Sequence, residues 1–347
     1  MSINPFSCTG EGFIGKDVRS FLSATLLKNW PERTSLTVTS TPDAVVPIAW
    51  RESLGNAGNT FCLVAGNGQS FHSSDGRAWR TGTAISFAGA PTQMALGEVD
   101  GGPAFMVGDS ATGSLHSSAD GGASAWVTRS TGGALGVVNS VCWAESLGLW
   151  VAGGFGQIAF SLNGVSWAAA TLPASWTGAS NKTIARIVWN GSLFVAISAT
   201  YHNEVLTSPD GAIWTARTLP MSATWDSLIC DPFAFNRWAV ATQAGYLVQS
   251  LDGVHWTTIA ATGFHGAHDM ACLGGAWVAT STGGDYGGVT YSLDCGLTWR
   301  QATVSPQAPS SGWRSVIAAD GRFLLAATST AGTAIEVVLS TIHCSST

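Results

Sequence analysis

Several segments of this chain combine aromatic rings with histidine, amide and carboxylate side chains. The candidate ligand-binding residues among them are Trp176, Tyr201, His202, Asn203, Glu204, His265, His268, Asp285 and Tyr286. Aromatic faces pack against the C–H surfaces of sugar rings, and polar groups beside them bond the hydroxyls. These residue types therefore predict a carbohydrate-binding surface. Trp225 and Trp313 each adjoin an apolar strand pattern, so for them we expect packing instead.

Hydrolysis of a glycosidic bond would need more than an aromatic surface, because a proton donor and a nucleophile or base must flank the sugar. Tyr201 with Glu204 is the one loop pair to consider for that chemistry. The other carboxylates that could act in pairs, Asp226, Asp269 and Asp285, are scattered along the chain. We therefore expect a binding protein with no catalytic residue, and we keep a glycoside hydrolase as the alternative.

One short segment has the spacing of metal ligands. His265, His268 and Asp269 place two imidazoles and a carboxylate within five positions, and such groups are competent zinc ligands. No second group of ligands accompanies them, so we expect these side chains to be hydrogen-bonded or solvated. We predict neither a metal nor a cofactor.

The elements that must position these residues follow from a repeat. Six times a Ser, a turn-forming Asp or Asn with Gly, and a Trp recur in this order, and consecutive tryptophans lie 41 to 47 positions apart. The repeated pairs are Asp75 and Trp79, Asp120 and Trp126, Asn163 and Trp167, Asp210 and Trp214, Asp252 and Trp256, and Asp294 and Trp299. A period of about 40 to 50 residues is typical of a four-stranded propeller blade.

These repeats resemble the Asp-box, or bacterial neuraminidase repeat, of sialidases, some other glycosidases, sortilin-type receptors and photosystem assembly factors. The resemblance implies a β-propeller and says little about function. An Asp or Asn in such a turn bonds backbone N–H groups, Gly supplies the positive φ, and Trp is buried. All twelve residues of the pairs above are therefore assigned a structural role. The arginine cluster of sialidases is incomplete here, since Arg186 and Arg314 are the arginines that we place on inner strands.

Apolar strand patterns between the repeats give the number of blades. We expect inner strands near residues 47–50, 93–96, 140–143, 185–189, 227–230 and 269–273. Three more strands follow the sixth repeat, at 314–318, 323–327 and 335–340, and segment 34–39 can supply the missing outer strand. An unpaired edge would leave the circle open. The sequence therefore predicts an all-β, seven-bladed β-propeller closed by N- and C-terminal strands in one blade, with six blades as the alternative.

The chain divides into an N-terminal segment, 1–29, and the propeller, 30–347. Val18, Phe21, Leu22 and Leu26 follow the spacing of one helical face, which predicts a short amphipathic helix over 16–28. This helix either packs on its own propeller or attaches the protein to a larger assembly.

Composition narrows the partners and the compartment. A net charge of −6 with only three lysines argues against nucleic acid or an anionic membrane as the main partner, and no apolar stretch is long enough to span a bilayer. The first residues lack a secretory signal pattern. Of the seven cysteines, Cys62, Cys142, Cys230 and Cys272 sit in apolar strand patterns. The thiols expected to react or crosslink are those of Cys8, Cys295 and Cys344.

A second resemblance concerns function. Segments 189–196 and 207–217 look like the propeller repeats of bacteriophage tail and other virion proteins. This implies a non-enzymatic virion structural protein, assembled in the host cytoplasm in multiple copies and anchored to other virion proteins through residues 1–29. The loop face of the propeller would contact a host-surface glycan or a neighbouring subunit. Alternatives are a sialidase-like or other glycoside hydrolase and an intracellular assembly scaffold.

Overall fold

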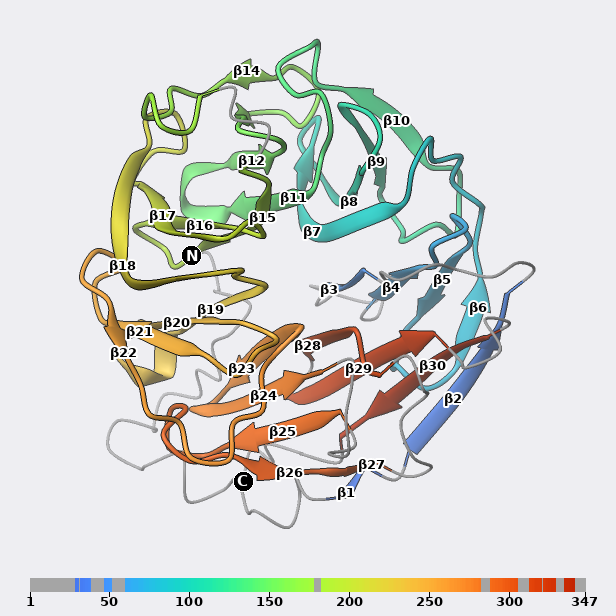
Figure 1. Cartoon of the computed structure of the whole chain (residues 1–347). Coiled ribbons are helices and arrows are strands. Elements are labelled where there is room, and N and C mark those ends of the chain that lie inside the picture. The colour runs from blue at the N-terminus through green and yellow to red at the C-terminus, as the bar shows by residue number, and fades with distance from the viewer. Residues whose placement is uncertain are drawn as a thin grey trace, which may run out of the picture.

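Seven four-stranded antiparallel sheets stand around a common axis in the computed structural model, so the chain is an all-β, seven-bladed β-propeller (Figure 1). The structure describes residues 29–30, 32–38, 47–51, 60–177, 182–281, 288–304, 312–319, 321–328 and 334–340. In these ranges the helical elements are two short 3-10 turns, Glu145–Leu147 and Pro232–Ala234. None of the described helices has the length and apolar character needed to cross a lipid bilayer.

Each blade takes its strands from the chain in order, from the axis outward, and only the seventh blade departs from this rule. Blade 1 contains β3 (Ile48–Arg51), β4 (Thr60–Val64), β5 (Ser70–Ser73) and β6 (Trp79–Thr81); blade 2 contains β7 (Pro91–Val99), β8 (Gly102–Asp109), β9 (Ser114–Ser118) and β10 (Val127–Ser130). Blade 3 contains β11 (Ser140–Ala144), β12 (Leu149–Gly153), β13 (Ile158–Ser161) and β14 (Ala168–Ala169); blade 4 contains β15 (Ile184–Trp189), β16 (Phe194–Ser198), β17 (His202–Ser208) and β18 (Thr215–Ala223). Blade 5 contains β19 (Ser227–Asp231), β20 (Arg237–Ala241), β21 (Leu247–Ser250) and β22 (Thr257–Thr258); blade 6 contains β23 (Asp269–Leu273), β24 (Ala276–Thr280), β25 (Val289–Ser292) and β26 (Arg300–Gln301). Blade 7 contains β28 (Ser315–Ala319), β29 (Arg322–Thr328), β30 (Ala334–Leu339) and, as its outer strand, β2 (Glu32–Thr37).

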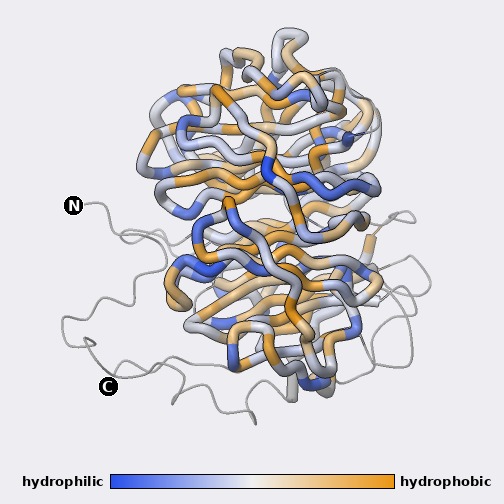
Figure 2. Tube along the Cα trace, turned by 60° about the vertical axis from the view of Figure 1, so that its left-hand side comes forward, coloured by the Kyte–Doolittle hydropathy of each residue, from blue (hydrophilic) through white to orange (hydrophobic). Residues whose placement is uncertain are grey.

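The core lies between neighbouring blades. Every residue of β12 and of β16 is buried, because each second strand is covered on both faces by the adjacent sheets. Between blades 3 and 4, Leu149 and Phe194 pack in one cluster with Trp214, the tryptophan of the repeat in blade 4. The outer strands β14 and β22 are exposed. Hydrophobic stretches accordingly recur throughout the body of the ring (Figure 2).

The ring closes through its two ends, as predicted. β2 pairs antiparallel with β30 in a register that sets Leu36 opposite Ile335. The hydroxyl of Ser35 donates to Oε1 of Glu336 at 3.1 Å, and Leu36 is buried. The outer strand begins two residues before the predicted 34–39 segment, and the six-bladed alternative is wrong. An unpredicted strand, β1 (Asn29–Trp30), also pairs in parallel with β27 (Thr303–Val304). The predicted helix over 16–28 lies outside the described residues.

The strand order separates two faces of the ring. The six Ser-to-Trp segments, here called the repeat turns, join third to outer strands and share one face with the inner-to-second connections. We call this the turn face. The opposite face, the loop face, carries the outer-to-inner and second-to-third connections. Every candidate ligand-binding residue that the structure describes belongs to the loop face or to the strand ends that border it.

Candidate functional site

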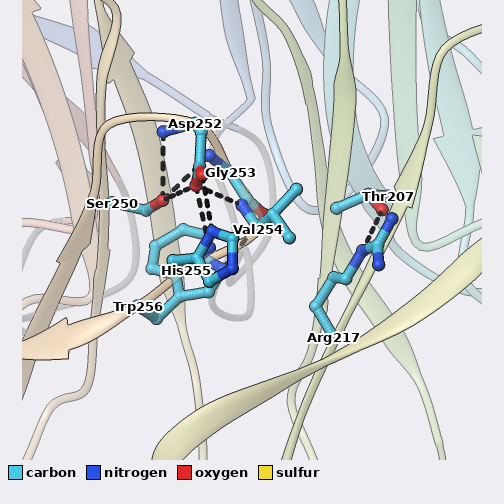
Figure 3. Close-up of polar contacts among 8 residues, drawn as sticks. All are labelled: Thr207, Arg217, Ser250, Asp252, Gly253, Val254, His255 and Trp256. Carbon is cyan, nitrogen blue, oxygen red and sulfur yellow. Dashed lines mark hydrogen bonds and ion pairs between the residues drawn. The ribbon is translucent and has the colours of Figure 1, made fainter.

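The repeat turns are internally bonded units, as the turn of blade 5 shows (Figure 3). Ser250 Oγ donates to Asp252 Oδ1 at 2.9 Å and accepts the N–H of Gly253 at 2.8 Å. The same Oδ1 accepts the backbone N–H of His255 at 2.8 Å, and Gly253 has a φ of 73°. Trp256 closes the turn by donating its Nε1–H to the Gly253 carbonyl at 3.1 Å. The polar groups of the turn thus form hydrogen bonds with one another.

The other repeat turns keep the bonds to the Asp or Asn side chain, including the two stretched copies. The closing bond of the tryptophan recurs for Trp79, Trp214 and Trp299, whereas Nε1 of Trp126 and of Trp167 is buried without a hydrogen-bond partner. Asp120 and Asp294 still accept backbone N–H groups, from Ser124 and Thr298 respectively. Hydrogen bonds from backbone N–H groups hold the pKa of Asp210 below its usual value, although burial opposes them. These carboxylates are therefore committed to their turns.

The thiol of Cys295 was expected to react or crosslink, but the structure buries it. Cys295 occupies the sixth repeat turn with a φ of 57° and is buried, so its thiol is not open to solvent. Its carbonyl accepts a hydrogen bond from Nε2 of Gln249 on the neighbouring blade at 2.7 Å. Cys295 is the extra residue of this stretched turn, and it packs in one cluster with Trp277 of blade 6. Cys8 and Cys344 lie outside the described residues.

On blade 4 the structure brings three of the predicted site residues together and adds a fourth, Lys182. Nε1 of Trp176 donates to Oε2 of Glu204 at 2.9 Å, and Lys182 Nζ lies 2.6 Å from the same oxygen. Lys182 Nζ also sits 4.7 Å from the centroid of the Trp176 ring, and His202 meets that ring edge-on at 5.2 Å. The Trp176 side chain is fully buried. It was expected to face a ligand, but its ring is enclosed by these neighbours.

The side chains of this blade 4 cluster shift one another's pKa values. Burial acts to raise the pKa of Glu204, but the hydrogen bond and charge of Lys182 and the hydrogen bond from Trp176 outweigh it, and the pKa lies below its usual value. Burial, then the positive charge of Lys182, lower the pKa of His202 to about 4. At neutral pH Glu204 is therefore a carboxylate and His202 is neutral. Tyr201 is 75% exposed and extends into solvent beside this network.

Exposed aromatic side chains occur at the same place in three consecutive blades. Phe155, Tyr201 and Tyr246 are 43%, 75% and 48% exposed, and each lies in the second-to-third connection of blade 3, 4 or 5. We call these three residues the aromatic row. Asn203 is exposed beside it. Of the row, only Tyr201 was predicted from the sequence. A comparison of repeats could have found the others, since each lies 6 to 9 positions before the Asp or Asn of its own repeat turn (155 to 163, 201 to 210, 246 to 252).

A second polar group lies at the loop-face end of the inner strands. Arg186 of β15 forms an ion pair with Asp269 of β23, with 2.7 Å between Nη2 and Oδ1, and so reaches across blade 5. Oδ2 of Asp269 accepts the backbone N–H of Val316 at 3.0 Å. His268 Nδ1 lies 3.0 Å from the carbonyl oxygen of Arg314 and must donate, because that oxygen can only accept. We call Arg186, His268, Asp269 and Arg314 the axial cluster.

The remaining predicted residues are distributed as follows. His265 is exposed whereas His268 is partly buried, and the described part of the chain contains no group of three His, Cys, Asp or Glu side chains arranged to hold a metal ion. Trp225 and Trp313 are fully buried, as packing requires. Asp285 and Tyr286 lie outside the described residues. The described candidates thus divide between blade 4, the axis and an exposed loop.

The solved structures show likeness in fold at low sequence identity. A catalytically inactive virginiamycin B lyase from Staphylococcus aureus, crystallised with quinupristin, superposes with a TM-score of 0.67 at 9% identity, over 90% of this chain and 99% of that one. YCF48 from Cyanidioschyzon merolae gives 0.62 at 16% identity, over 90% and 98% of the two chains. A YCF48 structure bound to D1 peptide gives 0.58 at 12% identity, over 89% and 97%. No protein-family model and no curated protein matches the sequence. At these identities the likeness establishes the propeller fold and leaves the activity open.

Proposed function

We propose that this propeller is a non-enzymatic binding protein, a structural component of a bacteriophage tail or fibre whose loop face binds a host-surface glycan. The aromatic row carries the proposal. Three exposed rings on adjacent blades form a repeated set of stacking platforms, which suits a ligand built from repeated units. The exposed amide of Asn203 beside Tyr201 supplies hydrogen bonds for hydroxyl groups. A neighbouring virion subunit is the other partner that this face would suit.

The state of the loop-face carboxylates supports binding over hydrolysis. Glu204 is held by Lys182 and Trp176. Asp226 accepts hydrogen bonds from the backbone and side-chain nitrogens of Gln243, at 3.2 and 3.1 Å. A general acid needs a pKa raised toward neutrality, and that of Glu204 is lowered. These observations favour binding over a sialidase-like or other glycoside hydrolase.

The virion assignment draws on the sequence. It is supported by the resemblance of the repeats to Asp-box and phage-tail propeller repeats and by the low lysine content. In this proposal residues 1–29 attach the propeller to other virion proteins. Mass spectrometry of purified particles from a host producing this protein should detect it in the virion fraction. Its absence from particles, with the protein abundant in the lysate, would argue against the virion role.

A variant series tests the binding surface. We expect the triple variant Phe155→Ala, Tyr201→Ala, Tyr246→Ala to lose binding on a glycan array while its melting temperature stays within a few degrees, because all three rings are exposed. Phe235→Ala is the matched control, since Phe235 is 85% exposed on the turn face. Unchanged binding by the triple variant would refute the role of the aromatic row. Release of reducing sugar by the wild-type protein would instead favour the hydrolase.

The second candidate is an assembly scaffold that binds a peptide. It is favoured by one comparison, the YCF48 structure bound to D1 peptide, which has the same fold. Exposed rings also accept the side chains of an extended peptide. Co-purification with one folding intermediate of a larger complex, and absence from finished particles, is the result that this candidate predicts.

A further inference from the structure

The loop-face ends of four inner strands, which surround the axis of the ring, carry unlike polar residues. Arg186 comes from β15, Ser227 begins β19, Asp269 begins β23, and Arg314 directly precedes β28. These strands belong to consecutive blades 4 to 7, and they stand next to one another around the centre of the ring (Figure 1). Charged residues make up only 10% of the chain, so this gathering of charge is unusual for the molecule.

The negative charge in this group is already paired with Arg186. Oδ1 of Asp269 accepts from Arg186 Nη2 at 2.7 Å and from the backbone N–H of Met270 at 2.9 Å. Oδ2 accepts the N–H of Val316. Asp269 therefore neutralises Arg186, and among the described residues it forms no ion pair with the second arginine, Arg314. Asp226, the other carboxylate nearby in the chain, is bonded to Gln243.

Arg314 has no counterion among the described residues. No described carboxylate lies within ion-pair distance of its guanidinium, and its Nε is buried without a hydrogen-bond partner. His268 does not supply a negative charge. Burial lowers its pKa, the charges of Arg186 and Arg314 lower it further, and Asp269 opposes them. The axial cluster therefore carries a net positive charge at neutral pH, in a chain whose net charge is −6.

An unpaired guanidinium that is partly removed from water is unfavourable, and a bound anion offsets that cost. Arginine presents a planar fork of donors that matches the oxygens of a carboxylate or phosphate. Two neutral groups can assist. The hydroxyl of Ser227 is buried and has no partner within the described ranges, and the His268 tautomer that donates from Nδ1 leaves Nε2 able to accept from a ligand hydroxyl.

We propose that the axis of the ring, on its loop face, is a binding site for an oxyanion, a carboxylate or phosphate group of a ligand, with Arg314 as its cationic contact. This site is distinct from the aromatic row and goes beyond the proposed glycan surface. In this proposal the ion pair of Arg186 with Asp269 borders the site, and the backbone bonds to Asp269 keep that pair in place.

Calorimetric titration of the full chain at low ionic strength tests the site with four probes: sodium acetate, inorganic phosphate, D-glucuronate and D-glucose. We expect at least one anion to bind and glucose not to bind. Saturable binding of glucuronate or acetate identifies a carboxylate ligand, and binding of phosphate alone identifies a phosphorylated one. Equal heats for glucuronate and glucose, or no binding by any anion, would overturn the proposal.

Two variants locate the binding. Arg314→Gln should lower the affinity for the anion at least tenfold. Arg300→Gln, which alters an exposed arginine on the outer strand β26, should leave the affinity unchanged. Anion binding that survives in Arg314→Gln refutes the assignment. A further readout needs no variant, because an anion that binds only the folded state raises the melting temperature. Phosphate or glucuronate should raise it above the value in sodium chloride of equal ionic strength, and the absence of any such rise would count against the site.

Discussion

At the scale of single residues, the repeat turns depend on an acceptor oxygen and do not need its charge. Five turns use Asp and the turn of blade 3 uses Asn163, whose Oδ1 accepts the backbone N–H groups of Val165 and Ser166 at 3.0 and 2.8 Å. Asp210 makes the same two bonds, at 2.9 and 3.0 Å. Asn163 and Asp210 thus make equivalent hydrogen bonds, which indicates that the position of the acceptor oxygen, and not its charge, stabilises the turn.

Asp210→Ala should destabilise the protein by about 2 kcal/mol, because two backbone N–H groups and the Ser208 hydroxyl lose their acceptor. Asp210→Asn should retain most of the stability. Urea denaturation measures both free energies of unfolding. Equal losses in the two variants would contradict the acceptor role, and loss of ligand binding without loss of stability would contradict the structural assignment.

Acid should decrease the stability of the protein in part through His202. The pKa of His202 falls from 6.5 to about 4 on folding, so between these values the unfolded chain binds more protons than the folded one. Stability must therefore decrease as pH falls from 6.5 toward 4. His202→Gln should make the free energy of unfolding less dependent on pH in this window.

His116 and His268 also have lowered pKa values and shift stability in the same direction, so some slope should remain in His202→Gln. An unchanged slope would show that the His202 pKa is not lowered. Chemical denaturation at several pH values in buffers of constant ionic strength provides the measurement.

At the scale of elements, the strands differ in how much each contributes to the stability of the protein. Second strands such as β16 are buried throughout, while outer strands such as β22 are short and exposed. The outer strand β2 is an exception. It pairs with β30 over six residues and buries Leu36, so it contributes both ladder hydrogen bonds and apolar contact.

A chain that begins at residue 41 should misfold or aggregate, because β30, whose residues are mostly buried, would be left as an unpaired edge strand. A chain that begins at residue 29 keeps β1 and β2 and is the matched control. Size-exclusion chromatography and thermal denaturation separate the outcomes. A soluble shorter chain as stable as the control would show that β2 is dispensable.

At the scale of the whole molecule, one sheet joins positions 301 apart in the sequence, as in the contact of Ser35 with Glu336. The ring is therefore a closed circle of seven interfaces in which each blade is covered on both sides. Opening the pairing of the chain ends exposes the edge of β30 and the buried side chain of Leu36. Stability of the ring should consequently depend strongly on this single junction.

A disulfide in the variant Ser35→Cys, Glu336→Cys should raise the melting temperature, since it removes the entropy of a very long loop from the unfolded chain. The loop-entropy relation gives about 6 kcal/mol for such a length, as an upper value. The same variant under reducing conditions is its own control. No difference between oxidised and reduced protein, with the disulfide verified by mass spectrometry, would contradict the importance of the junction.

The repeat turns, the number of blades and the closing strand could be predicted from the amino-acid sequence. A repeat turn is local, since Ser250, Asp252, Gly253 and Trp256 satisfy one another within seven positions. Local bonding of this kind is visible in a linear pattern. Once seven units are counted, the pairing of the chain ends follows from the need to remove an open edge.

The contacts between side chains of different loops and blades could not be predicted in this way, because they depend on the folded ring. The enclosure of Trp176 depends on Lys182 and Glu204, which come from different segments, and the pair of Arg186 with Asp269 spans blade 5. Likewise, exposure of Phe155 and Tyr246 depends on how neighbouring blades cover each loop. The contacts of Trp176 and of Arg186 arise from the curvature of the ring and the paths of long connections, and no short-range spacing along the chain encodes them.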